Sequence, residues 1–264
     1  MNSTGTSARI GHIAFNTFRE AVRDRVLYNL LFFALLMIAA AILVGQISIG
    51  IEQIVIVSLG LTAISVIGIL ISIFIGVSLV SKEMEKRTLY ALLAKPVRRW
   101  EFLLGKFGGL VLTLVVNTAA MAVGLFLALL YVKHPLERGD LAVLAAVYFI
   151  LLKLALIVAL ALLFSCYTTP ILATLFTAGL YVAGLFVQQL KNLRSDVMNP
   201  AMAAFTRVLA YLLPNFDNYD VMGAAAHGQA IPGMLIFENT LYTVVYCAIV
   251  LSVAAVVFSR RDLK

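Results

Sequence analysis

Long apolar blocks are the feature that most restricts how this chain can fold. A helix needs roughly 20 apolar residues to cross the hydrocarbon core of a bilayer. The blocks that approach or exceed this length are Val26 to Gly45, Ile54 to Val80, Phe107 to Val132, Leu141 to Ser165, Pro170 to Val187 and Thr240 to Phe258. Because only helices and closed barrels satisfy the backbone in lipid, the blocks predict an all-α polytopic membrane protein with six transmembrane helices. We expect a single transmembrane domain over residues 1–264.

Composition supports this interpretation. The chain has 264 residues, of which 62% are hydrophobic and 12% charged, and its mean hydropathy is +1.02. These values exclude a water-soluble protein. The 20 Lys and Arg residues against 13 Asp and Glu do not indicate a nucleic-acid partner, because the basic residues gather in segments on one side of the predicted spans. By the positive-inside rule this side is cytoplasmic, together with both termini.

The segments outside the apolar blocks predict a surface helix, an outer loop and a tight turn. Residues 10–25 place apolar and charged side chains on opposite sides of a helix, which predicts an amphipathic helix at the cytoplasmic membrane surface. A loose polar tail is the alternative. The segment 188–239 is predicted to be extracytoplasmic, with a short helix that starts near Asn199-Pro200. Cys166 to Thr169 is predicted to be a tight cytoplasmic turn, with threonine hydroxyls that can cap the next helix and Pro170 in its first turn.

The only long charged passage between two apolar blocks is the segment 82–106, KEMEKRTLYALLAKPVRRWEFLLGK. Leu89, Leu92 and Leu93 recur at i, i+3 and i+4, so a helix from about Glu83 to Ala94 would carry one apolar ridge. Pro96 is expected to end it, since its ring removes a backbone donor. A ridged helix of this kind in the cytoplasm needs a partner surface.

This passage resembles the cytoplasmic coupling segment of type-2 ATP-binding-cassette (ABC) transporter permeases. The resemblance rests on Glu85, Thr88, Leu89, Leu92, Leu93, Lys95-Pro96-Val97, Arg99 and Gly105-Lys106. The sequence TLYALLAKPVRRWEFLLGK of residues 88–106 is most similar to the branch named for multicopper-enzyme maturation. Arg87 departs from the glycine that many relatives carry before the threonine.

The resemblance implies a permease subunit, usually of an exporter, that works with a separate ABC ATPase. ATP and Mg would be bound by that partner, and this chain would bind no cofactor. A second permease copy or homologue is implied, in a bacterial or archaeal cytoplasmic membrane, and an extracytoplasmic accessory protein is a further candidate partner. The implied ATPase-coupling residues are Glu83, Glu85, Arg87, Thr88, Leu89, Leu92, Leu93, Lys95, Pro96, Arg98 and Arg99.

Motifs for catalysis are absent from the sequence. Gly105-Lys106 is followed by Phe107 and lacks the upstream glycine of a phosphate-binding loop, and no H-E-x-x-H or G-x-S-x-G occurs in the blocks. An enzyme is therefore disfavoured. The alternative to an ABC permease is an ATP-independent channel or secondary carrier, which usually shows several ionisable groups within its spans.

Lys153 is the one formal charge deep within a block. An ammonium near mid-membrane costs ~2.5 to 3.5 kcal/mol on insertion scales, so it should face the protein interior or water. It is a candidate contact for an anionic or polar substrate group, or a candidate gate. The structural alternatives are a lysine that pairs with a helix carbonyl or with Asn117, or one that snorkels outward to the membrane surface. Asn117 itself is a candidate for the translocation path or for bonding between helices.

Other features favour structural roles. Gly60, Gly68 and Gly76 are spaced by eight residues, which places them near one helix face and predicts close packing. Cys166 and Cys247 support neither a disulfide nor a thiolate metal site. The histidines lack a second ligand at metal-binding spacing, and we expect no metal site.

Overall fold

The computed structural model describes residues 6–48, 50–85, 99–132, 141–192, 206, 208, 211 and 213–260. Within them the regular elements are helices. These are α1 (Thr6–Val22), α2 (Arg25–Ile47), α3 (Glu52–Glu85), α5 (Arg99–Val132), α6 (Leu141–Ser165), α7 (Pro170–Leu185), α8 (Val187–Asn192), the 3-10 helix η3 (Asp217–Tyr219), α10 (Met222–Ala226) and α11 (Gly233–Arg260). The chain is an all-α polytopic membrane protein, as the apolar blocks predicted.

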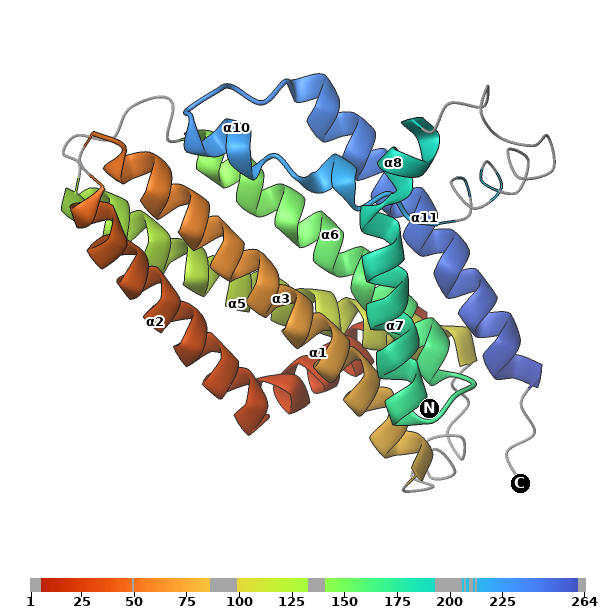
Figure 1. The fold of residues 1–264 in the computed structure, drawn as a ribbon. Helices are drawn as coiled ribbons and strands as arrows, with labels where there is room; N and C mark the ends of the chain where they lie inside the picture. Colours follow the sequence, from red (N-terminus) through yellow and green to blue (C-terminus); the bar gives the residue numbers. More distant parts are fainter. Residues whose placement is uncertain are drawn as a thin grey trace.

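The long helices form one bundle, with α1 crossing it at one end and α8 and α10 lying at the other (Figure 1). In the described part of the chain, five helices are long and apolar enough to cross a membrane: Leu27–Ile47, Glu52–Ser78, Trp100–Val132, Leu141–Ser165 and Gly233–Ser259. The fifth predicted span corresponds to α7, which has 16 residues. At 1.5 Å per residue it is roughly 24 Å long, so its crossing of the membrane stays a prediction.

The centre of the bundle is α6, which packs against α3, α11, α5 and α7. Its sequence is apolar around the whole circumference, and most of its residues are buried. A helix of this kind cannot direct one face to solvent and instead becomes the core around which other helices pack. Lys153 lies in the middle of α6 and is therefore held inside the protein.

Glycines bring α3 close to its neighbours. A Cβ atom on Gly68 would lie 2.7 Å from Leu154 Cδ1, and one on Gly76 would lie 3.0 Å from Ala161 Cβ, both on α6. Gly60 instead faces Leu125 of α5. The prediction of close packing is confirmed, but the three glycines serve two partner helices.

The helix ends differ from the expected ones at several points. α1 begins at Thr6 and ends at Val22, before the break at Arg23 and Asp24 that separates it from α2. α3 continues to Glu85 and α5 begins at Arg99, so both helices extend beyond the predicted apolar spans. Most of the short helix predicted after Asn199-Pro200 lies outside the described residues.

The turn between α6 and α7 corrects one expectation. The tight turn and the position of Pro170 in the first turn of α7 are confirmed, but Thr169 makes no capping hydrogen bond with its side chain. The Thr168 hydroxyl donates instead to the carbonyl of Phe164 at 2.8 Å. Because Pro170 has no N–H and sits at the helix start, one of the unpaired donors of the first turn is already missing.

Candidate functional site: the joint between α1 and α5

The sequence-predicted coupling residues divide into two groups. Those that lie outside the described residues are Arg87, Thr88, Leu89, Leu92, Leu93, Lys95, Pro96 and Arg98. Glu83 and Glu85 belong to the last turns of α3, and Arg99 is the first residue of α5. The helices on either side of the predicted coupling helix are thus known, and the first turns of α5 are bound to α1.

A glycine surface on α5 receives α1. A Cβ atom on Gly105 would lie 2.6 Å from Ile13 Cβ, and one on Gly109 would lie 2.6 Å from Thr17 Cβ. Gly109 is also closely approached by the carbonyl oxygen of Ala14. Since any larger residue would push the helices apart, Gly105 and Gly109 allow the two backbones to come into contact. Ile13 and Thr17 therefore pack directly against α5.

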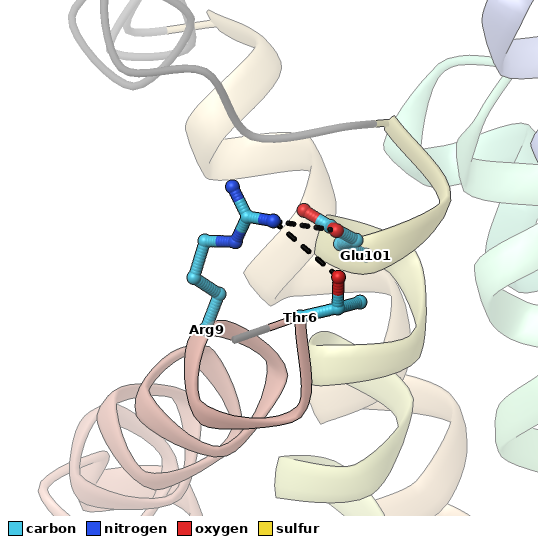
Figure 2. A network of polar contacts seen from close by, with 3 residues as sticks. All are labelled: Thr6, Arg9 and Glu101. Carbon is cyan, nitrogen blue, oxygen red and sulfur yellow. Dashed lines mark hydrogen bonds and ion pairs between the residues drawn. The ribbon is translucent and has the colours of Figure 1, made fainter. Parts of the chain in front are cut away.

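An ion pair fixes the N-terminal part of α1 to the first turn of α5. Arg9 Nη2 lies 3.3 Å from Glu101 Oε1 and 3.4 Å from the Thr6 hydroxyl (Figure 2). The Glu101 side chain is 0% exposed, whereas that of Arg9 is 30% exposed. Burying a carboxylate is costly unless a cation and hydrogen bonds compensate it, so the pairing with Arg9 helps Glu101 remain inside the joint.

A second charged contact lies one turn further along α5. Lys106 Nζ is 3.7 Å from Glu20 Oε2 of α1 and 5.8 Å from the centre of the Phe102 ring. The Phe102 ring stacks on Phe258 of α11, with 6.1 Å between ring centres. The Lys106 side chain is 2% exposed. The contacts of α5 at this end thus join α1 and α11.

The joint gives α1 two different faces. Ala21 and Thr17 are buried against the bundle, whereas Phe15 is 58% exposed. Because the structure contains no membrane, the predicted position of α1 at the lipid surface stays a prediction; an exposed phenylalanine beside charged residues fits it.

Sequence reasoning found Gly105 and Lys106 only as part of a resemblance, and it missed Glu101 and Gly109. The signal that could have identified Gly109 is its spacing from Gly105, which is the small-xxx-small pattern of closely packed helix pairs. Glu101 could not be assigned a partner, since Arg9 is 92 positions away.

Lys153 and Asn117 lie outside this joint. Lys153 Nζ donates to Ser65 Oγ of α3 at 2.7 Å, so its partner is a hydroxyl and the expected pairing with Asn117 or a helix carbonyl is wrong. Asn117 donates through Nδ2 to the Thr113 carbonyl of its own helix at 2.8 Å. Both side chains are buried. The two candidate path residues are therefore not brought together by a hydrogen bond.

No cluster of three or more His, Cys, Asp or Glu side chains that could hold a metal occurs among the described residues. Cys166 and Cys247 are both buried. The joint thus contains charge pairs and close helix contacts.

The comparison with protein families agrees with the architecture. A family model described as "ABC-2 family transporter protein" matches residues 12–263. A search of curated proteins found no match for this chain. Since the family match extends over almost all of this polytopic helical chain, the protein belongs to the ABC-2 family of membrane transporter proteins.

Proposed function

We propose that this protein is the membrane-spanning permease subunit of an ATP-driven transporter, and that it couples hydrolysis by a separate ATPase to movement across the membrane. Family membership supports a transport component with an ATPase partner. The observation that carries the coupling proposal is the continuity of α5, which runs from Arg99, within the predicted coupling segment 82–106, through the joint with α1.

The proposed mechanism follows from this continuity. When the ATPase pushes the ridge of Leu89, Leu92 and Leu93, the force reaches the first turn of α5. The Arg9–Glu101 ion pair and the glycine surface make α1 and this part of α5 one unit, so both helices tilt together. Closely packed interfaces transmit such a displacement because they have little room to deform.

Other parts of the proposal rest on the resemblance and on charge placement. We infer a dimer of permease subunits, ATP and Mg on the ATPase, and export as the direction. The segment 82–106 and both termini would face the cytoplasm, in the inner membrane of a bacterium or archaeon. Membership of the multicopper-enzyme-maturation branch is inferred from the sequence of residues 88–106.

The test is co-purification of the ATPase with a permease that carries Leu92→Asp and Leu93→Asp. Acidic side chains on the ridge should abolish ATPase binding while the permease still inserts into the membrane. Ala91→Asp with Ala94→Asp is the matched control, because these positions lie on the other side of the same predicted helix. Normal ATPase recovery with the ridge variant, or equal loss with the control, would contradict the assignment.

A further inference from the structure

α1 turns one face to the bundle and the opposite face away from it. Ile13 and Thr17 pack against α5, and Ala21, one turn after Thr17, is buried. Phe15 lies two residues from both Ile13 and Thr17, which is roughly 200° around the helix, and it is 58% exposed. Its ring centre is 6.5 Å from that of Phe18, which is half-buried. The face turned away from α5 thus presents an aromatic pair.

Two arginines extend this face. Arg19 follows Phe15 by four residues, so the two side chains project from the same side of the helix. The backbone N–H of Arg23 donates to the Arg19 carbonyl at 3.3 Å, which places Arg23 one further turn along although α1 ends at Val22. Both arginines are exposed. Phe15, Phe18, Arg19 and Arg23 are here called the outward surface of α1.

The outward surface carries positive charge that the described residues do not neutralise. No described carboxylate lies within 4.0 Å of the guanidinium of Arg19 or Arg23. Glu20, the one acidic residue within α1, lies instead 3.7 Å from Lys106 of α5. An arginine without a carboxylate partner has five N–H donors for another anion, and its planar guanidinium matches phosphate geometry. The outward surface therefore suits a phosphate group.

The neighbouring spans put α1 at the edge of the hydrocarbon core. The span Trp100–Val132 has 33 residues and would be roughly 50 Å long, about 20 Å more than the core is thick. Gly105 and Gly109, on which α1 packs, lie in the first third of this span, close to where the core would begin. The span Leu27–Ile47 also begins soon after α1 ends at Val22. Both neighbours thus place α1 at the boundary between lipid chains and headgroups.

An acidic phospholipid matches both parts of the outward surface at this depth. Phe15 and Phe18 can enter the region of the acyl chains, while the long side chains of Arg19 and Arg23 reach the phosphate layer. A soluble protein is a poorer match, because it would have to cover aromatic side chains where the lipid chains begin. A zwitterionic lipid lacks the net negative charge that would attract the two arginines.

We propose that the outward surface of α1 is a binding site for an acidic phospholipid, with Arg19 and Arg23 on the headgroup and Phe15 and Phe18 among the chains. Because the opposite face of α1 packs on α5, the bound lipid would hold the joint against the membrane. This role requires a membrane-spanning fold and is independent of coupling to an ATPase.

The test measures lipid contact at position 15 by fluorescence quenching. Trp100 is the one tryptophan of the chain, so Trp100→Phe with Phe15→Trp leaves a single reporter on the outward surface. The purified protein is placed in vesicles of phosphatidylglycerol and phosphatidylcholine, in which one or the other lipid carries brominated chains that quench tryptophan on contact. Phosphatidylglycerol should show the higher affinity at this position, by roughly fivefold or more.

Charge variants and a second reporter provide the controls. Arg19→Gln with Arg23→Gln should remove the preference for phosphatidylglycerol, whereas Arg19→Lys with Arg23→Lys should retain it because the charges remain. Leu175→Trp in the Trp100→Phe background is the matched reporter. Leu175 is exposed near the start of α7, at the same end of the bundle as α1 (Figure 1), and no Lys or Arg occurs between positions 154 and 190. Both lipids should quench this reporter equally.

Three outcomes would overturn the proposal. Weak quenching by both lipids at position 15 would mean that this face lies against protein, and an ATPase surface would replace the lipid site. A preference that survives the two glutamine substitutions would exclude the arginines as headgroup ligands. An equal preference at position 175 would mean that acidic lipid gathers around the whole protein. Since no ATPase takes part in the measurement, these outcomes are distinct from failure of the coupling proposal.

Discussion

Arg9 Nη2 on α1 lies 3.3 Å from Glu101 Oε1 on α5, and this contact joins residues 92 positions apart in the chain. The carboxylate is fully buried and the guanidinium is partly hydrated. The two halves of the pair therefore differ in what their removal costs, and that difference can be measured.

Arg9→Met should destabilise the protein more than Glu101→Gln. The first change takes a cation from a buried carboxylate, at a cost of roughly 1–3 kcal/mol. The second leaves an amide that still accepts a hydrogen bond, and the partly exposed Arg9 can be hydrated by water. Thermal unfolding in detergent measures both variants, with the exposed Arg19→Met on the same helix as control. The reverse order would show that Glu101 does not depend on Arg9.

Gly109→Ala should disrupt the joint, whereas Gly108→Ala should not. A Cβ atom on Gly109 would lie 2.6 Å from Thr17 Cβ, but one on Gly108 would lie 3.7 Å from Ala14 Cβ, an ordinary contact. Overpacking of this kind costs about 1–3 kcal/mol. Unfolding temperatures of the two variants provide the comparison. Equal stability of both would mean that α1 does not rest on this part of α5.

Gly184→Ala should loosen residues 213–226, the segment that contains η3 and α10, because its new methyl group would meet Phe216 Cδ2 and the Pro214 carbonyl oxygen at 2.5 Å. Gly179→Ala on the same helix is the control, since a Cβ atom there meets nothing within 4 Å. It should be neutral or stabilise the helix by up to about 1 kcal/mol. Limited proteolysis of residues 213–226 measures the difference. Equal resistance to the protease in the two variants would contradict the close packing of Phe216 against Gly184.

Cysteines at the two ends of α7 should be accessible from opposite sides of the membrane. Tyr167→Cys and Gln189→Cys suit this purpose because both native side chains are exposed. With the buried Cys166 and Cys247 replaced by alanine, a membrane-impermeant maleimide should label each site from one side only. Labelling of both from the same side would mean that the 16-residue helix does not cross.

Much of the helical architecture is predictable because a membrane span is a local property. Runs such as Leu141 to Ser165 are apolar on every side, and a chain in lipid has no other way to satisfy their backbone groups than a helix. The same reasoning predicted that Lys153 faces the protein interior or water before any partner was known. Close packing at Gly68 and Gly76 also followed from spacing alone.

Partners distant along the chain could not be predicted in this way. The sequence determined where the helices are and that Lys153 must avoid lipid. Only the tertiary structure decided that Lys153 donates a hydrogen bond to Ser65 and that Arg9 pairs with Glu101. It also decided that Gly60 faces α5 while Gly68 faces α6. The physical reason is that hydropathy acts residue by residue, whereas the choice between hydroxyl, amide and carboxylate partners depends on how whole helices rotate and cross when they pack.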